Sequence, residues 1–438
     1  MDNQESVMVT PVAGLLTADF AADFADFIST SPTSYHAAAE IARQLAAAGF
    51  VEQDETAAWQ GLTRGYVVRG GAVIAWQLPE KFDAFRIVGC HTDSPSFKLK
   101  PNPESEAHDF SQVNVEVYGG PLLNSWLNRD LGIAGQLAEL NGETHLVSTG
   151  GPVMTIPQMA PHLDRSVNDR LELSRQRDYH PIWALKEAEI LPYLCDLAGL
   201  DPQRVAGMDL YAYDVCTPAC FGGTAGTDFF AAGRQDNLSS VYAGLRAFLE
   251  IAANNGAESA ATDALIFAAF DHEEVGSSTY SGAAGPLLEQ ILERVALAAG
   301  ATRADFLQLL ANSSCVSADA GHSINPNKPE KHDPDHHPVL GGGPLVKINA
   351  NQRYATEATG IALWLRACAA AGVPTQEFVS NNDVPCGSTI GPATASRLGI
   401  VTVDVGVPLL SMHSVREISN PRDLLAMAQA LQGYWQGA

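Results

Sequence analysis

Residues 264–277, Ala-Leu-Ile-Phe-Ala-Ala-Phe-Asp-His-Glu-Glu-Val-Gly-Ser, join a wholly apolar run to a cluster of ionisable side chains. A short apolar run of this kind, bounded by polar residues, is typical of a strand that is buried on both faces of a sheet. Two adjacent carboxylates, Glu273 and Glu274, come shortly after it, and their mutual repulsion near a buried strand end costs free energy unless a cation compensates it. The segment therefore predicts a central strand with a functional site at its carboxyl end.

Helix and strand patterns alternate around this run along the chain after Gly233. We expect helices at Leu238–Ala253, Pro286–Leu297 and Thr356–Ala371, and strands at Ala264–Phe270, Cys315–Ala318 and Ile400–Val405. Closer to the amino terminus, we expect helices over 16–48 with a break at Ser31-Pro32, and strands at Tyr66–Val68, Ala72–Leu78 and Phe85–Cys90. This alternation predicts an α/β fold, with helices on both sides of a mixed, largely parallel sheet.

The middle of the chain differs in composition and in its hydrophobic pattern. It is rich in Gly and Pro and contains alternating segments such as Val113–Tyr118, which favour short strands over long helices. We therefore predict one discontinuous α/β domain, residues 1–100 and 231–438, interrupted by a β-rich insertion at 101–230.

Composition excludes several classes of protein. The 438 residues carry 26 Lys plus Arg against 50 Asp plus Glu, a net charge of −24, which argues against binding to nucleic acid or to an anionic membrane surface. No apolar run approaches the roughly 20 residues that a membrane-spanning helix needs. The start of the chain has no features of a secretory signal, and seven scattered cysteines do not form a disulfide framework, so we expect a cytoplasmic protein.

Ionisable side chains recur at the ends of the predicted strands. His91 and Asp93 follow one strand, Asp319 follows another, Asp236 opens a helix, and His413 comes after the last strand. Taken singly, His91 could be an ordinary loop residue and Asp236 a helix cap. Together with the Glu pair, they have the composition of a two-metal site, whose nitrogen and oxygen ligands suit zinc, manganese or cobalt. A spare Glu beside a ligand Glu is a candidate general base.

Longer motifs carry a resemblance to a known family. They are HTDSPSFKLKPNP, GRQDNLSS, FDHEEVGSSTYSGA, SADAGH, KINANQRYA, NNDVPCGSTIGP and SMHSVRE. In this order, from about residue 20 to the carboxyl terminus, the chain resembles the aspartyl aminopeptidases, the M18 family of metallopeptidases. The resemblance implies a metallopeptidase α/β/α domain in which the insertion at 101–230 is a dimerisation domain.

The resemblance also implies roles for individual residues. Two divalent ions per subunit, zinc in the first place with manganese and cobalt as alternatives, would be held by His91, Asp236 and Asp319 at one position and by Asp236, Glu274 and His413 at the other. Glu273 would be the general base toward a water that bridges the two ions, and Asp93 would orient the His91 ring. Lys347, Tyr354 and Met412 would bind the substrate, and His162 would reach the active site of a neighbouring subunit to stabilise the oxyanion.

The function that follows is hydrolysis of an N-terminal Asp or Glu from peptides with a free acidic amino terminus. The resemblance further implies a homo-oligomer of twelve subunits. Two alternatives stay open: a di-metal deacylase or amidohydrolase of the same layout, and a catalytically silent assembly scaffold.

Overall fold

A nine-stranded sheet is the largest element of the computed structural model, which describes residues 16–61, 63–254 and 263–437. Its strands, in spatial order, are β1 (Val51–Glu52), β2 (Arg64–Arg69), β3 (Ala72–Gln77), β13 (Ala264–Phe270), β4 (Phe85–His91), β14 (Ser314–Ala318), β18 (Val401–Gly406), β16 (Leu345–Ile348) and β17 (Gln376–Val379). The apolar run at 264–270 is thus an interior strand, and all of its residues are buried.

The pairing of the central strands decides where the site forms. Strands β13, β4, β14 and β18 are neighbours and run parallel, with Phe270 opposite His91 and Ser317 opposite both Gly89 and Asp404. Strand β3 pairs antiparallel with β13, and β16 pairs antiparallel with β18, so the sheet is mixed. Because parallel strands end at the same edge of a sheet, the loops that follow these four strands are brought together.

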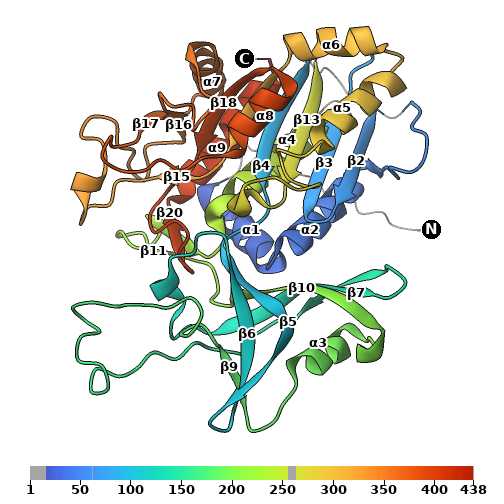
Figure 1. Cartoon of the computed structure of the whole chain (residues 1–438). Coiled ribbons are helices and arrows are strands. Elements are labelled where there is room, and N and C mark those ends of the chain that lie inside the picture. Colours follow the sequence, from blue (N-terminus) through green and yellow to red (C-terminus); the bar gives the residue numbers. More distant parts are fainter. Residues whose placement is uncertain (1–15, 62, 255–262, 438) are drawn as a thin grey trace.

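Helices cover both faces of this sheet, as the α/β prediction requires (Figure 1). One face packs against α1 (Thr17–Thr30), α2 (Ser34–Ala47), α4 (Gln235–Asn254), α7 (Ala358–Ala371) and α9 (Pro421–Trp435). The other face packs against α5 (Leu287–Ala298), α6 (Arg303–Asn312) and α8 (Ile390–Leu398). Alternate residues of β13 enter the two cores, Phe267 on one side and Ile266 on the other, as the period of two in a strand dictates.

A second, six-stranded sheet has its own core. Its strands, in spatial order, are β8 (Thr144–Ser148), β7 (Leu131–Glu139), β10 (Val205–Asp214), β5 (Ser96–Ala107), β6 (Phe110–Tyr118) and β9 (Ile182–Leu185). All neighbours in it are antiparallel, and the helix α3 (Ile190–Ala198) packs on it. This sheet spans residues 96–214, so it begins before residue 101 and ends before residue 230. The division into two domains stays a prediction.

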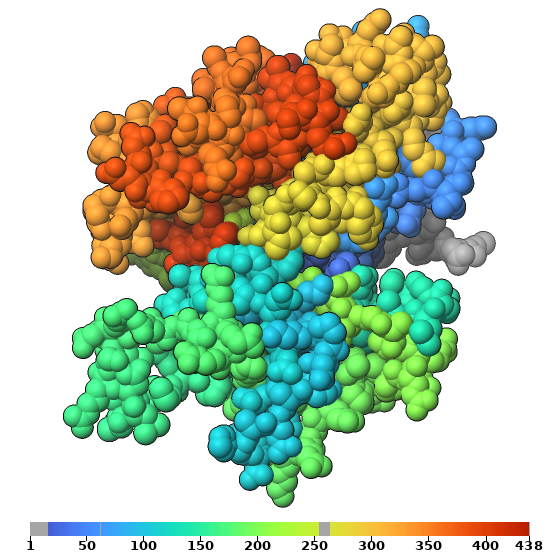
Figure 2. Space-filling model, viewed as in Figure 1, coloured from blue at the N-terminus to red at the C-terminus, as the bar shows by residue number. Residues whose placement is uncertain are grey.

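Small sheets tie the carboxyl-terminal segment to the rest. Strands β11 (Ala219–Phe221), β12 (Phe229–Ala232) and β20 (Glu417–Ser419) form one of them, and β15 (Gly321–His322) pairs with β19 (Pro408–Leu409). The space-filling view shows the six-stranded sheet region, in cyan and green, as a lower lobe beneath the body built on the nine strands (Figure 2). None of the helices in the described ranges has the length and apolarity to cross a bilayer.

Candidate metal centre and active site

The loops at one edge of the nine-stranded sheet bring the five predicted ligand residues together. His91 is the last residue of β4, Asp319 directly follows β14, and Glu274 lies in the 3-10 turn Glu273–Val275 that follows β13. Asp236 stands in the first turn of α4, and His413 lies in the turn between β19 and β20. The site is therefore assembled from five separate segments of the chain.

Asp236 lies between the two histidines. Its Oδ1 atom is 3.4 Å from Nε2 of His91, and its Oδ2 atom is 3.4 Å from Nε2 of His413. The same His91 nitrogen is 3.6 Å from Oδ1 of Asp319, and the same His413 nitrogen is 3.6 Å from Oε2 of Glu274. One carboxylate thus serves two groups of donors, which is the arrangement expected of a ligand that bridges two ions.

The buried charges of this cluster fit a bound cation. Oδ1 of Asp236 and Oε1 of Glu274 are buried and have no hydrogen-bond partner among the described residues. Burial raises the pKa of Glu274 well above its ordinary value, and the carboxylates of Asp236 and Glu273 raise it further, against the opposing effect of His413. Donor atoms of His91, Asp236 and Glu274 all lie within 4.8 Å of one another. Nitrogen and oxygen donors this close suit a divalent ion such as zinc.

Asp93 connects two of the ligand loops. Its Oδ1 accepts the backbone N–H of Glu273 at 3.0 Å, and its Oδ2 accepts the N–H of Glu274 at 3.1 Å and the hydroxyl of Tyr118 at 2.8 Å. Nδ1 of His91 lies 3.0 Å from the Asp93 backbone carbonyl, closer than the 3.4 Å to the carboxylate. Burial acts to raise the pKa of Asp93, but hydrogen bonds from His91, Tyr118 and the Glu274 backbone lower it. Asp93 therefore orients His91 and the Glu pair.

Glu273 lies beside the ligands and is partly buried. Burial raises its pKa to about 8, and the carboxylates of Asp319, Asp236 and Asp93 also raise it, against the lowering effect of His91. A carboxyl group whose pKa is shifted toward neutrality is suited to accept and release a proton near neutral pH.

Glu417 is a site residue that the sequence analysis did not single out. Its carboxylate is buried and accepts the backbone N–H groups of both Asp236 and His413. Glu417 belongs to the SMHSVRE motif, four residues after His413, and this proximity to a candidate ligand could have identified it from the sequence. Tyr118, the partner of Asp93, comes from β6 in the second sheet, and no local pattern pointed to it.

The backbone around the ligands is strained. Arg234, His272, Ser411 and His413 all have left-handed backbone, with φ between 57° and 63°. Each such non-glycine residue costs on the order of 1–3 kcal/mol and persists only where surrounding contacts enforce it. The ligand loops are therefore held in place by their neighbours and not by their own preferences.

Two of the predicted substrate residues adjoin the ligand Asp319. Nζ of Lys347, on β16, is buried, donates a hydrogen bond to the Ala320 carbonyl at 2.6 Å, and lies 3.9 Å from Oδ2 of Asp319. The same ammonium lies 5.4 Å from the centre of the Tyr354 ring. Met412 is partly buried next to His413 and packs against the core beneath it.

His162 lies elsewhere in the subunit. It is exposed in a turn of the loop between β8 and β9, and no contact in the described part of this chain joins it to the ligands. A single subunit therefore does not bring His162 into its own site.

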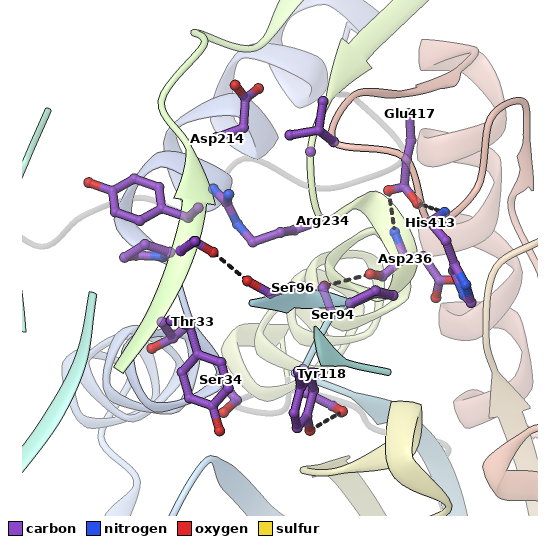
Figure 3. Close-up of a pocket in the computed structure, with 18 of the residues that line it drawn as sticks. Thr33, Ser34, Ser94, Ser96, Tyr118, Asp214, Arg234, Asp236, His413 and Glu417 are labelled. Carbon is purple, nitrogen blue, oxygen red and sulfur yellow. Dashed lines mark hydrogen bonds and ion pairs between the residues drawn. The ribbon is translucent and has the colours of Figure 1, made fainter. Parts of the chain in front are cut away.

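A pocket that opens to solvent adjoins the ligands on the side of the second sheet. Its lining includes Ser94, Tyr118, Arg234, Asp236, His413 and Glu417 (Figure 3). Figure 3 shows Glu417 and His413 close to Asp236, with dashed bonds that link Glu417 to the other two.

Known proteins resemble the chain over nearly its whole length. A relative from Streptomyces coelicolor, named "Probable M18 family aminopeptidase 2", is 47% identical over 423 residues, which cover 94% of this chain and 97% of the relative. The cryo-EM structure of the Ape4 and Nbr1 complex superimposes with a TM-score of 0.91 at 31% identity and covers 97% of this chain and 86% of that chain. The "Structure of S. cerevesiae mApe1 dodecamer" has a TM-score of 0.82 at 30% identity, and the match covers 95% of this chain and 97% of that chain.

The match at the level of the family is equally broad. Residues 27–435 fit the family described as "Aminopeptidase I zinc metalloprotease (M18)", so every ligand residue and both sheets fall within it. The resemblance drawn from the motifs is confirmed, and the chain belongs to the M18 family of zinc aminopeptidases.

Proposed function

We propose that this M18 aminopeptidase removes an N-terminal Asp or Glu from peptides and holds two divalent ions, zinc before manganese or cobalt. The observation that carries the acidic preference is the buried ammonium of Lys347 beside the ligand Asp319. A ligand residue marks where the scissile bond lies, so a cation next to it lies within reach of the first side chain of the substrate.

The environment of Lys347 supports selection of a carboxylate. An ammonium group has three donors, and the one hydrogen bond described for it goes to a neutral carbonyl, that of Ala320. A substrate carboxylate would accept hydrogen bonds from the remaining donors of the ammonium, whereas a neutral apolar side chain would leave those donors without an acceptor, at the cost of desolvation. The net charge of −24 opposes acidic peptides at long range, so the preference requires a local cation that acts at short range.

The residues of the chain divide the chemical work. When bound, the two ions would polarise the scissile carbonyl and lower the pKa of water. Glu273 accepts the proton of the attacking water and delivers it to the leaving amine. Asp93 keeps Glu273 in place through its backbone N–H, and the carboxylates around the site recognise the free amino group of the peptide.

A substrate panel tests this function. The purified protein, reconstituted with zinc, is assayed on peptides that begin with Asp, Glu, Leu or N-acetyl-Asp, and compared with a Lys347→Met variant. We expect the wild-type protein to prefer Asp and Glu. We expect Lys347→Met to lower kcat/KM on these two substrates by a factor equivalent to about 2–5 kcal/mol, as for other buried charge pairs. Its kcat/KM on the Leu peptide should change little.

The matched control is Lys331→Met, which removes an exposed lysine of the 3-10 turn Pro329–Lys331. A wild-type preference for Leu would refute the acidic specificity. Activity on the N-acetyl substrate alone would favour the deacylase alternative, and the absence of turnover on every substrate would favour the silent scaffold.

We propose further that the chain forms a homo-oligomer, with twelve subunits as in the dodecameric yeast structure. The second sheet supports this, because it and its loops expose large apolar side chains, among them Leu140, Met159, Leu163 and Leu185. In such an assembly, the exposed His162 would stabilise the oxyanion in the site of a neighbour. The seven cysteines are all free, which agrees with the predicted cytoplasmic location.

A further inference from the structure

Glu417 joins the segments of Asp236 and His413 at the end of the small sheet, beyond the last paired residues of β12 and β20. Its Oε2 accepts the backbone N–H of Asp236 at 3.0 Å, and its Oε1 accepts the backbone N–H of His413 at 2.8 Å. Among the described residues, no Lys or Arg forms an ion pair with this carboxylate. Both of its oxygens therefore act on the backbone of predicted metal ligands.

Both N–H groups need a partner of this kind. Asp236 has non-helical backbone within the first turn of α4, with φ −83° and ψ 102°, and His413 has left-handed backbone, with φ 63°. Neither N–H can join a regular helix or strand ladder, and a buried N–H without a partner is costly. The carboxylate supplies strong, charge-assisted hydrogen bonds to both.

Glu417 is itself rigidly held. It is 1% exposed and opens strand β20, in register opposite Ala232 of β12. Nε2 of Gln235 donates to the Glu417 carbonyl at 2.8 Å, and the hydroxyl of Ser419 donates to Oε1 of Gln235 at 2.6 Å. The small sheet thus fixes the carboxylate before it reaches the ligand loops.

The other half of the site is organised by a different carboxylate. Asp93 accepts the N–H groups of Glu273 and Glu274 and lies against His91, whereas Glu417 accepts those of Asp236 and His413. His413 belongs to only one of the two proposed metal positions. Displacement of Glu417 would therefore disturb the position of Asp236, Glu274 and His413 more than the one that contains His91 and Asp319.

We propose that Glu417 is a positioning residue that sets the separation of Asp236 and His413 and thereby builds the second metal position. The inference rests on the proposed two-ion site. Loss of a partner that orients a ligand costs about 10- to 100-fold in metal affinity, and we expect a loss of this size at the second position and a smaller one at the first, which shares Asp236.

The test is a titration of the metal-free full-length protein with zinc. Calorimetry measures the two affinities, and metal analysis after gel filtration measures the number of ions bound. Glu417→Gln keeps the shape but turns an NH₂ group toward one N–H, and Glu417→Asp keeps the charge but is one methylene too short to reach both. Both variants should bind the second zinc ion about 10- to 100-fold more weakly than the wild-type protein does, and the first ion with a clearly smaller loss. Glu250→Gln, a buried glutamate of α4 that accepts from Gln432, is the control and should leave both affinities unchanged.

Double variants, in which Glu417→Gln is combined with a change of one candidate ligand, identify the metal position that is weakened. Added to His413→Ala, Glu417→Gln should weaken zinc binding little further, whereas added to His91→Ala it should weaken the remaining site strongly. Equal weakening of both ions, or full affinity in Glu417→Asp, would overturn the proposal. Thermal melting separates a local effect from a failure to fold. A wild-type protein that takes up a single zinc ion would refute the two-ion function itself, before any Glu417 variant is measured.

Discussion

The two sheets of this protein depart from the usual distribution of side chains in opposite ways. At the edge of the nine-stranded sheet, charged groups are buried: His91 is 1% exposed and Asp236 is 4% exposed. On the six-stranded sheet and its loops, apolar groups are exposed: Leu163 is 77% exposed and Leu185 is 72% exposed. Ordinary folding places charge outside and apolar groups inside.

Each departure is explained by a binding partner that stabilises the unusual groups. Buried carboxylate oxygens without a hydrogen-bond partner, such as Oδ1 of Asp236 and Oε1 of Glu274, are stabilised by cations. Exposed apolar side chains are stabilised by contact with another protein surface. The first region is thus suited to chemistry within one subunit and the second to assembly between subunits.

The largest effect should come from the catalytic carboxylate in the first region. Glu273→Gln preserves the shape of the side chain but removes its capacity to accept a proton, and general acid–base catalysis contributes about 10²- to 10⁴-fold in rate. We expect kcat to fall by that factor with two zinc ions still bound, as measured by steady-state kinetics and metal analysis. Unchanged turnover would refute the assignment of Glu273 as the base.

Removal of the metal should loosen the first region and spare the second. Ions present at about 100 times Kd stabilise the folded state by about 2.7 kcal/mol, so treatment with a chelator should lower the melting temperature and added zinc should restore it. Hydrogen exchange should rise at residues 91–93 and 236–238 and stay constant in β7. A uniform rise over both sheets would show that the two regions are not independent.

A charge on the exposed apolar surface should have the smallest effect on the subunit itself. Leu163→Asp should alter the stability of one subunit by no more than about 0.5 kcal/mol, because the side chain is exposed. It should nevertheless shift the protein to smaller species in light scattering, and turnover should fall with the mass if His162 acts across subunits. Leu297→Asp, at an exposed position on α5 that is 48% exposed, is the control and should preserve the assembly. Loss of assembly in both variants would remove the special role of the second sheet.

Local patterns were sufficient for much of the α/β architecture. The strand expected at Ala264–Phe270 is β13 with the same ends, and the helix expected at Thr356–Ala371 is α7, which begins two residues later, at Ala358. The helices α3, α6, α8 and α9 were not expected. Helix α6 begins with a capping box of Thr302 and Asp305, a signal that was present in the sequence but not used.

The sequence by itself determined the buried central strands, the types of the candidate ligand side chains, and through its motifs the family. Each of these depends on residues that are close together in the chain. Only the tertiary structure decided how the ligands are held. Asp93 reaches Glu274 across 181 positions and Glu417 reaches Asp236 across another 181, and Tyr118 joins the site from a different sheet. Contacts of this kind leave no periodic pattern, because they depend on which strand ends meet when the whole sheet has formed.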